Sequence, residues 1–258
     1  MISSLLIILL GAGLWYLSEY HKKRKELLEN TPTTPICHLS EGFREVKGKI
    51  VFLDLLKSPV SRRDCVYYRV ELKEKQTKTY YSSGRSRSRT EWVTIFHETR
   101  ALPFCLQDAT GLVLVDPENA SIELASDKQL SSGMFNSPSP DMESFFKARG
   151  IESTSFFGFN RSMSLTESYL VPGDALFIHG QAEILRDTAI FQNRGENLNP
   201  PEFVIKRAGG PEFLITDSSE EKLISRYFWN MVMYRALGVF CILLGLYLIL
   251  FLRGFSLF

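Results

Sequence analysis

The sequence predicts a mainly β domain held between two membrane-spanning helices. Residues 1–18 carry no charged side chain, and residues 236–252 form an uninterrupted apolar run. Between these ends, short segments of alternating polar and apolar residues recur and are separated by turn-forming residues. A period of two is typical of half-buried strands, and many short strands indicate a barrel or a sandwich. We therefore expect an antiparallel β-barrel, for which an OB-like barrel is one form, with an insertion that contains a helix.

The first segment, residues 1–20, is expected to be a transmembrane helix. About 20 apolar residues cross a hydrocarbon core of roughly 30 Å. A cleaved signal peptide is the alternative, but it usually begins with basic residues and ends at small ones. The sequence Leu-Ser-Glu-Tyr at residues 17–20 is a poor cleavage site. A retained anchor is therefore expected, followed by a basic juxtamembrane linker over residues 21–34.

The last segment, residues 218–258, is expected to form a helix that continues into a second span over residues 227–252. Ser218 and Glu221 have the spacing of a capping box, which predicts where the helix begins. Arg235 is the only charged residue in this span, and its long side chain can reach the membrane interface. No turn signal separates the soluble part of the helix from the span.

Basic residues predict the orientation of both spans. Lysine and arginine accumulate on the cytoplasmic side of membrane proteins. Here they follow the first span and mostly precede the second, so the central domain is expected in the cytoplasm with both termini outside. The flanking residues are Lys22, Lys23, Arg24, Lys25, Arg226, Arg235 and Arg253.

The strand pattern occupies residues 35–217. In the first strand Val46, Ile50 and Phe52 point one way, whereas Glu45 and neighbouring lysines point the other. Further strands are expected at residues 65–72, 91–98, 103–106, 112–115, 121–124, 175–178, 182–185 and 213–215.

Two features modify this pattern. Residues 126–167 are irregular, and we interpret them as an insertion with a short helix at 141–149 that ends at Gly150. Gly48 and Gly180 lie inside expected strands, where glycine often marks a bend or a close backbone approach.

Composition excludes several classes of function. Thirty Lys and Arg residues against 29 Asp and Glu give a net charge of +1, which argues against bulk nucleic-acid binding. Of the four cysteines, Cys241 lies in the second span. The other three cannot form a closed set of disulfides, so a reducing compartment is favoured. No zinc-ligand spacing and no phosphate-binding glycine loop is present, so no cofactor is expected.

The candidate catalytic side chains are few. His97 and His179 are possible bases, and Cys105 is a possible nucleophile, but no motif brings a nucleophile, a base and an orienting group together. Buried free thiols, including Cys65, and satisfied or exposed histidines are the ordinary interpretation. We therefore expect no catalytic site, and an unrecognised hydrolase remains the alternative.

A basic hairpin is the candidate contact surface. Runs of charge are usually solvated, so an exposed hairpin loop is the simplest interpretation. Contact with anionic lipid head groups is the second, and RNA binding through arginines and stackable tyrosines is the third. The basic residues concerned are Lys73, Lys75, Lys78, Arg85, Arg87 and Arg89.

Several short motifs occur in a characteristic order. Residues 41–48 read Glu-Gly-Phe-Arg-Glu-Val-Lys-Gly, 56–59 read Leu-Lys-Ser-Pro, and 65–68 read Cys-Val-Tyr-Tyr. They are followed by Val-Asp-Pro at 115–117 and Pro-Gly-Asp at 172–174. In this order and between two apolar segments, the motifs resemble the GIDE domain, also called BAM, for beside a membrane. This domain occurs in MULAN-type mitochondrial E3 ubiquitin ligases and their RING-less prokaryotic relatives.

The resemblance implies a membrane-proximal domain related to ubiquitin ligases. In the eukaryotic members the ligase activity belongs to a RING finger after the second span, whereas the five residues after Arg253 contain no zinc ligand. We therefore expect an interaction or scaffold module whose partner is a membrane or envelope protein, a second copy of the chain, or anionic lipid. The alternative is a ligase-related protein that acts with a RING in trans.

The resemblance and the charge pattern disagree on topology. In the mitochondrial relatives the matching domain lies between the two membranes, whereas the basic residues here place it in the cytoplasm. We follow the charges, because four Lys or Arg residues adjoin the first span on one side and none on the other.

Overall fold

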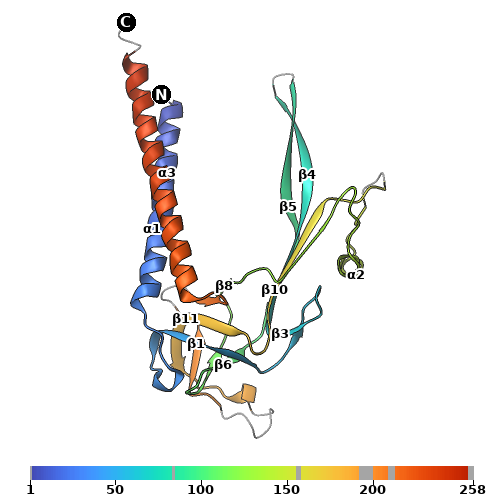
Figure 1. The fold of residues 1–258 in the computed structure, drawn as a ribbon, viewed down its shortest axis with the longest axis vertical. Coiled ribbons are helices and arrows are strands. Elements are labelled where there is room, and N and C mark those ends of the chain that lie inside the picture. The colour runs from blue at the N-terminus through green and yellow to red at the C-terminus, as the bar shows by residue number, and fades with distance from the viewer. Residues whose placement is uncertain (1, 83–84, 155–157, 192–199, 209–212, 255–258) are drawn as a thin grey trace. The chain divides into compact units, whose positions relative to one another are not determined.

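The computed structural model describes residues 2–82, 85–154, 158–191, 200–208 and 213–254 (Figure 1). The chain forms two compact units. The helical unit comprises residues 1–32 and 218–258, and the β unit comprises residues 33–217.

Two long helices make up the helical unit, α1 (Ile2–Asn30) and α3 (Glu220–Gly254). As expected, α3 is continuous, and its first turn is closed by the Leu223 N–H, which donates to the Ser219 carbonyl at 3.1 Å. The helix α1 continues through residues 21–30, where the sequence predicts a linker. Lys25 and Glu29 form an ion pair of 2.6 Å one turn apart, and such pairs support a helix there.

Glycines allow α1 and α3 to pack closely and in opposite directions. A Cβ atom on Gly11 would lie 2.8 Å from the Gly238 carbonyl oxygen, and one on Gly238 would lie 2.9 Å from the Gly11 oxygen. Farther along, a Cβ on Gly245 would lie 3.0 Å from the Ser4 oxygen. Small residues at such crossings let two helix backbones approach, as in membrane helix pairs.

One helical segment among the described residues, Glu221–Phe251, is long and apolar enough to cross a membrane. This result rests on length and composition. The first expected span lies within α1, which is a helix but does not meet the same criterion over its described residues.

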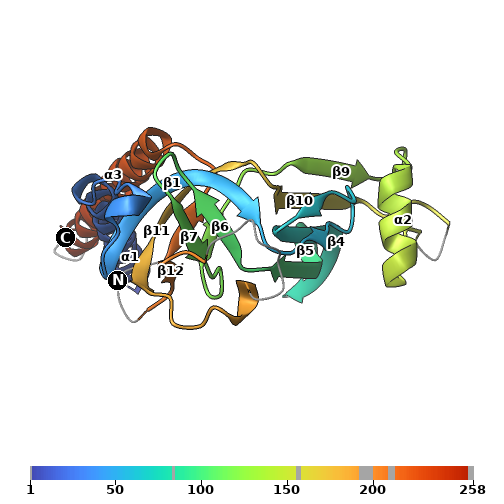
Figure 2. The ribbon, with the colours of Figure 1, turned by 90° about the horizontal axis from the view of Figure 1, so that it is seen from below.

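A closed five-stranded barrel forms the centre of the β unit (Figure 2). Its strands follow the order β1-β6-β7-β12-β11, and β11 pairs with β1 to close the barrel. Two short strands, β13 and β8, extend the sheet beside β11. The bounds are β1 (Gly42–Phe52), β6 (Phe104–Gln107), β7 (Leu112–Val115), β8 (Ser121–Glu123), β11 (Ala175–Ile184), β12 (Phe203–Lys206) and β13 (Leu214–Thr216).

The expectation of a wholly antiparallel barrel is wrong at one seam. β12 pairs with β7 in parallel, and β13 pairs with β8 in parallel, whereas the other barrel pairs are antiparallel. A parallel pair needs a long crossover between its strands. The chain supplies one here, because residues 116–202, which include two strands of a second sheet and a helix, lie between β7 and β12.

The two glycines singled out in the sequence lie at close approaches inside the barrel. A Cβ on Gly48 would lie 2.5 Å from the Gln107 carbonyl oxygen, and one on Gly180 would lie 2.7 Å from the Phe213 ring. Because Gly180 keeps its pairing with Arg44, the two strands expected at residues 175–185 form the single strand β11.

A four-stranded sheet, ordered β5-β4-β10-β9, forms the second part of the β unit. The helix α2 (Pro140–Arg149) packs on it, and its Met142, Phe145 and Phe146 join Val70 and Leu165 in one core. The strands are β4 (Tyr67–Ser82), β5 (Arg85–Ala101), β9 (Lys128–Ser132) and β10 (Met163–Leu170), preceded by the pair β2 (Leu56–Lys57) and β3 (Asp64–Cys65).

The expected insertion over residues 126–167 is more regular than its sequence suggests. The helix is present with the expected end, since Gly150 adopts a left-handed φ of 65° and the Ser139 hydroxyl caps the start by accepting from the Met142 N–H. However, β9 and the start of β10 are ordered strands. β9 reads Lys-Gln-Leu-Ser-Ser and has too little alternation to predict a strand, whereas β10 begins with a short alternation, Met-Ser-Leu-Thr, that the expected insertion overlooks.

Candidate functional site

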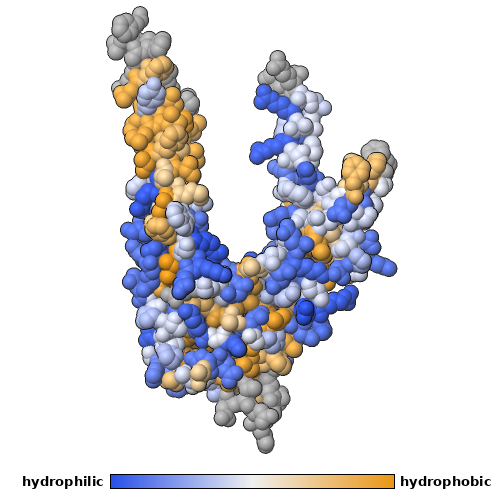
Figure 3. All heavy atoms as spheres, in the orientation of Figure 1, coloured by the Kyte–Doolittle hydropathy of each residue, from blue (hydrophilic) through white to orange (hydrophobic). Residues whose placement is uncertain are grey.

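The basic segment forms a two-stranded ribbon in place of the expected hairpin loop. β10 pairs with β4 only as far as Glu74, whereas β5 pairs with β4 from Tyr67 to Ser82. Beyond a register shift at Leu72 and Lys73, the two strands therefore extend past the rest of their sheet. We define the basic ribbon as residues 75–82 and 85–92. Figure 3 shows mostly hydrophilic residues over it.

The pairing register separates the predicted contact residues onto two faces of the ribbon. Lys78 lies opposite Arg89, and Tyr80 lies opposite Arg87, so these four side chains share one face. Lys75 lies opposite Trp92 on the other face. The backbone of Arg85 begins β5.

Ion pairing leaves part of this charge uncompensated. Lys78 pairs with Glu91 at 2.5 Å, and Lys73, at the base of the ribbon, pairs with Glu71 at 2.9 Å. In the described part of the chain, Lys75, Arg87 and Arg89 have no such partner. Lys78 and Arg89 lie directly opposite one another, and the carboxylate of Glu91 on the same face attracts both of these cations.

Exposed aromatic residues accompany the cations. Tyr81 is 84% exposed, and Tyr80 and Trp92 are both 52% exposed. Aromatic rings with a polar edge are typical of surfaces that meet a membrane interface or a partner.

The predicted membrane-flanking residues make specific contacts within the helical unit. Arg235 forms a 2.5 Å ion pair with Glu19 of α1, and its guanidinium lies 5.1 Å from the Trp15 ring centre. Arg24 donates to the Tyr227 hydroxyl at 2.8 Å. Lys22, Lys23 and Lys25 lie on the same helix as Arg24, Arg226 lies over the Tyr227 ring, and Arg253 belongs to the last turn of α3. The charge of Arg235, for which the sequence suggested contact with the membrane interface, is thus paired with a carboxylate of the neighbouring helix.

The candidate catalytic pair is placed in different sheets. His97 is exposed in β5, where its Nε2 lies 3.4 Å from the Thr99 hydroxyl. Cys105 is buried in the barrel against Leu53 and Leu114. Among the described residues, no group of three or more His, Cys, Asp or Glu side chains could hold a metal ion.

The other two candidate side chains, Cys65 and His179, are buried, and burial shifts the pKa of each. Burial, together with the carboxylates of Glu167 and Asp64, raises the pKa of Cys65 to about 11, so its thiol is protonated at neutral pH. The pKa of His179 falls to about 4 because the ring is buried.

Two polar residues of the barrel depart from their expected places. His179 lies in the middle of β11 and is 1% exposed, with the Phe43 ring packed edge-on at 4.4 Å, although the sequence suggests a strand end. Glu45 is wholly buried, although its alternation suggests an outward side chain, and it accepts a hydrogen bond from Thr33. Both lie on the face of the strands opposite to the barrel core, so this outer face is covered at these two positions, although Lys47 and Lys49 on the same face are exposed.

A basic pocket is a further candidate site, and no local sequence pattern predicts it. It has a volume of about 560 Å³ and lies between the loop of residues 58–63 and the end of α2. Its cations are separated by some 90 residues in sequence, so no local charge run marks them. The lining includes Lys57, Ser58, Arg62, Tyr68, Ala148 and Arg149.

A larger groove of about 580 Å³ lies along β12 and the end of β11. It mixes acidic residues such as Asp116 and Asp187 with basic ones such as Arg186, and it has apolar walls that include Leu114. This mixture indicates no single class of ligand.

Fold and surface together define a mainly β barrel protein with an apolar C-terminal helix and a basic ribbon. A family model, GIDE, described as E3 Ubiquitin ligase, matches residues 73–251 of the chain. Because this match covers more than half of the sequence, the chain belongs to the GIDE family. No curated protein and no solved structure matches it.

Proposed function

We propose that this GIDE-family chain is a two-span membrane protein whose β unit acts as an interaction module beside the membrane. Two spans are supported by the packing of α1 along α3. The apolar stretches, residues 1–18 and 236–251, are each roughly 24–27 Å long as helices. Both end at the same level, where Glu19 and Arg235 form their ion pair. A paired charge at this position is compatible with the membrane interface.

We further propose that the β unit faces the cytoplasm, on the strength of the basic residues 22–25 of α1. Reporter insertions test this orientation. Alkaline phosphatase inserted at Asn119, in the turn between β7 and β8, should be inactive, whereas fluorescent protein there should fluoresce. Phosphatase at either terminus should be active. Neutral replacements of residues 22–25 should weaken the preference, and an active phosphatase at Asn119 in the unaltered chain would contradict it.

The barrel is proposed to be OB-like. Numbered along the chain, its five strands follow the order 1-2-3-5-4 and close from the fourth to the first, with a parallel pair between the third and the fifth. A closed five-stranded barrel with one such seam supports this assignment. The ligands of other OB-like barrels are not carried over to this chain.

The basic ribbon is proposed to be the surface that binds, with anionic lipid head groups as its ligand. Support comes from Lys75, Arg87 and Arg89, which form no ion pair with any described residue and lie beside exposed aromatic rings. Basic residues near an anionic bilayer gain electrostatic attraction that falls off within a Debye length. Tyrosine and tryptophan are enriched at the head-group level of membranes.

Tryptophan fluorescence offers a direct test, because the chain has only three tryptophans. With Trp15→Phe and Trp229→Phe, Trp92 of the ribbon becomes the sole emitter. In bilayers with brominated anionic lipid, its emission should be quenched more than with brominated neutral lipid, and salt should reduce the difference. The variant Lys75→Gln/Arg87→Gln/Arg89→Gln should abolish the difference in quenching between the two lipids.

A matched control removes the same charge elsewhere, with Lys49→Gln/Arg63→Gln/Arg186→Gln, and should leave the quenching unchanged. Equal quenching by both lipids, or equal loss in both triple variants, would count against the ribbon. If the ribbon bound a membrane protein and did not bind anionic lipid, the ligand of the ribbon would be a protein partner.

Ubiquitin ligation with a RING protein in trans is the second candidate function, and the description of the matching family favours it. A reconstituted reaction with activating and conjugating enzymes tests it. Ligation that depends on this chain, stoichiometric zinc, or loss of function in folded His97→Ala, Cys65→Ala or Cys105→Ala variants would support an enzyme. Unchanged function in all three variants, without ligation, would support the interaction module.

A further inference from the structure

The basic pocket beside α2 has the dimensions of a small-ligand site. Its volume of about 560 Å³ falls within the range of pockets that hold a compact organic molecule. Three cationic side chains, Lys57, Arg62 and Arg149, contribute to its lining, and no acidic side chain does among the described residues. It lies apart from the basic ribbon in the sequence, since none of its lining residues belongs to that ribbon.

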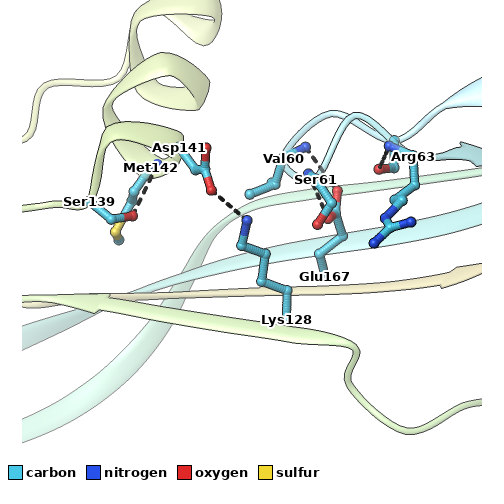
Figure 4. Close-up of polar contacts among 9 residues, drawn as sticks. Val60, Ser61, Arg63, Lys128, Ser139, Asp141, Met142 and Glu167 are labelled. Carbon is cyan, nitrogen blue, oxygen red and sulfur yellow. Dashed lines mark hydrogen bonds and ion pairs between the residues drawn. The ribbon is translucent and has the colours of Figure 1, made fainter.

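The loop that forms one wall is held by a buried carboxylate (Figure 4). Glu167, 1% exposed, accepts from the Val60 N–H at 2.8 Å and from the Ser61 N–H at 2.9 Å. The Ser58 hydroxyl accepts from the Arg63 N–H at 3.1 Å, and the Ser58 N–H donates to the Arg63 carbonyl at 2.9 Å. The wall is therefore rigid before any ligand arrives.

Arg62 is presented by this loop in a conformation that arginine rarely adopts. Its φ is 54°, in the left-handed region, and its side chain is exposed. Within the described chain its guanidinium has no ion pair or hydrogen-bond partner. Backbone strain of this kind persists where surrounding contacts enforce it and is often found at binding sites.

Arg149 on the opposite wall is also oriented in advance. Its guanidinium donates to Glu98 at 2.6 Å and lies 5.3 Å from the Phe145 ring centre. The carbonyl end of α2 carries a partial negative charge, but Lys147 and Arg149 in the last turn offset it. Lys57 pairs with Asp64 at the rim, where its side chain is 69% exposed.

We propose that this pocket binds a phosphate ester through Arg62 and Arg149, with Lys57 at the rim. A guanidinium fork matches two oxygens of a phosphate, and two forks on opposite walls can engage the same group. The remaining volume accommodates the organic part of the ligand. A soluble phosphorylated molecule and a phosphorylated lipid head group offer the same chemistry to these side chains.

Calorimetry on the full chain in nanodiscs of neutral lipid provides the test, with inorganic pyrophosphate as the probe. Saturable binding is expected, with citrate markedly weaker. Nanodiscs that contain phosphatidylinositol 4-phosphate identify the source. If the lipid head group occupies the pocket, pyrophosphate should bind more weakly to the chain in these nanodiscs. If the natural ligand is a soluble molecule, pyrophosphate binding should be the same as in neutral nanodiscs.

Three variants locate the site. Arg62→Gln removes the unpaired guanidinium and should weaken pyrophosphate binding roughly tenfold or more, as expected for a lost charge-assisted hydrogen bond. Arg62→Gly should do the same while the loop keeps its shape, because glycine adopts a left-handed φ without strain. Arg63→Gln is the matched control, since it removes the same charge from a neighbour that does not line the pocket.

The proposal would be overturned if pyrophosphate did not bind, if citrate bound equally well, or if Arg63→Gln weakened binding as much as Arg62→Gln. The ribbon variant Lys75→Gln/Arg87→Gln/Arg89→Gln should retain pyrophosphate binding, so a failure of the ribbon as a lipid contact would not affect this site.

Discussion

Glu167 shows how a single side chain can fix a loop. The sequence analysis places it at the end of the irregular insertion, and its partner Ser61 lies 106 positions away. A buried carboxylate is tolerated only when hydrogen bonds satisfy its charge, and two backbone N–H groups do so here. This dependence could not be predicted, because nothing in the local sequence relates the two segments.

Glu167→Ala should destabilise the β unit by about 1–3 kcal/mol, because the buried N–H of Val60 would lose its acceptor. The denaturation midpoint should fall. Trypsin should also cleave the native chain faster after Arg62 or Arg63, since the loop would no longer be held. Glu143→Ala, at an exposed position of α2, should change neither quantity. An unaltered cleavage rate in Glu167→Ala would contradict the role of this carboxylate.

Thiol labelling should distinguish the cysteines of the β unit. Cys37 is exposed, whereas Cys65 and Cys105 are buried, and the pKa of Cys65 is raised to about 11. Because the thiolate is the reactive form, a maleimide near pH 8 should modify Cys37 rapidly and the other two only after unfolding. Mass spectrometry of the peptides measures this. Rapid native labelling of Cys65 would show that its environment is more open than the structure indicates.

At the scale of elements, the sequence pattern predicts that a helix or strand is present better than it predicts which other elements it contacts. The continuous apolar runs of α3 and β7 predicted a helix and a strand because each run extends over most or all of its element. The length of β5 was underestimated, since polar residues near the ribbon tip carry no burial signal. The packing of α1 against α3 depends on glycines whose partners lie over 200 residues away, and local patterns do not reveal such pairs.

Gly11→Val should disrupt the helix pair, whereas Gly13→Val should not. A Cβ on Gly11 would lie 2.7 Å from the Ile242 side chain and 2.8 Å from the Gly238 oxygen, whereas one on Gly13 would meet nothing within 4 Å. Cysteines introduced at Glu19 and Arg235, whose side chains meet across the two helices, should be joined by a short bifunctional maleimide in the parent chain and in Gly13→Val. Their cross-linking should be strongly reduced in Gly11→Val. Equal yields in both valine variants would exclude the close crossing.

The docking of α2 onto its sheet should depend on pH at both extremes. Although partial burial acts in the opposite direction, hydrogen bonds from Tyr68 and Arg149 lower the pKa of Glu98. Its stabilising contribution is thus present above the ordinary carboxyl pKa and is lost as the pH falls through the lower folded value. Burial and the bond to Glu98 raise the pKa of Tyr68 to about 12, so its contribution is lost as the pH rises above 10.

Tyr68→Phe should therefore lose less stability than the parent chain between about pH 9 and 11. Denaturation midpoints at both pH values measure the difference. Tyr80→Phe, which changes an exposed tyrosine, should behave as the parent chain. A parallel decline in all three proteins would show that Tyr68 does not carry the alkaline dependence.

For the whole molecule, the sequence indicated a mainly β barrel joined to an apolar C-terminal helix, and both are present. The parallel seam between β7 and β12 was missed, because strand direction depends on the path of the intervening chain and not on the strands themselves. The basic pocket was missed for a similar reason. Arg62 and Arg149 become neighbours only when α2 packs on the four-stranded sheet.

The interrupted path of the barrel also governs the order in which this protein can fold during synthesis. β1 emerges early, yet its partner in closing the barrel is β11, and Gly42 pairs with Ala182. The hairpin of β4 and β5 needs only neighbouring residues, so it can form while the ribosome is still translating later strands. β1 must remain unpaired along that edge until β11 has been made. During this interval its exposed edge is open to incorrect pairing.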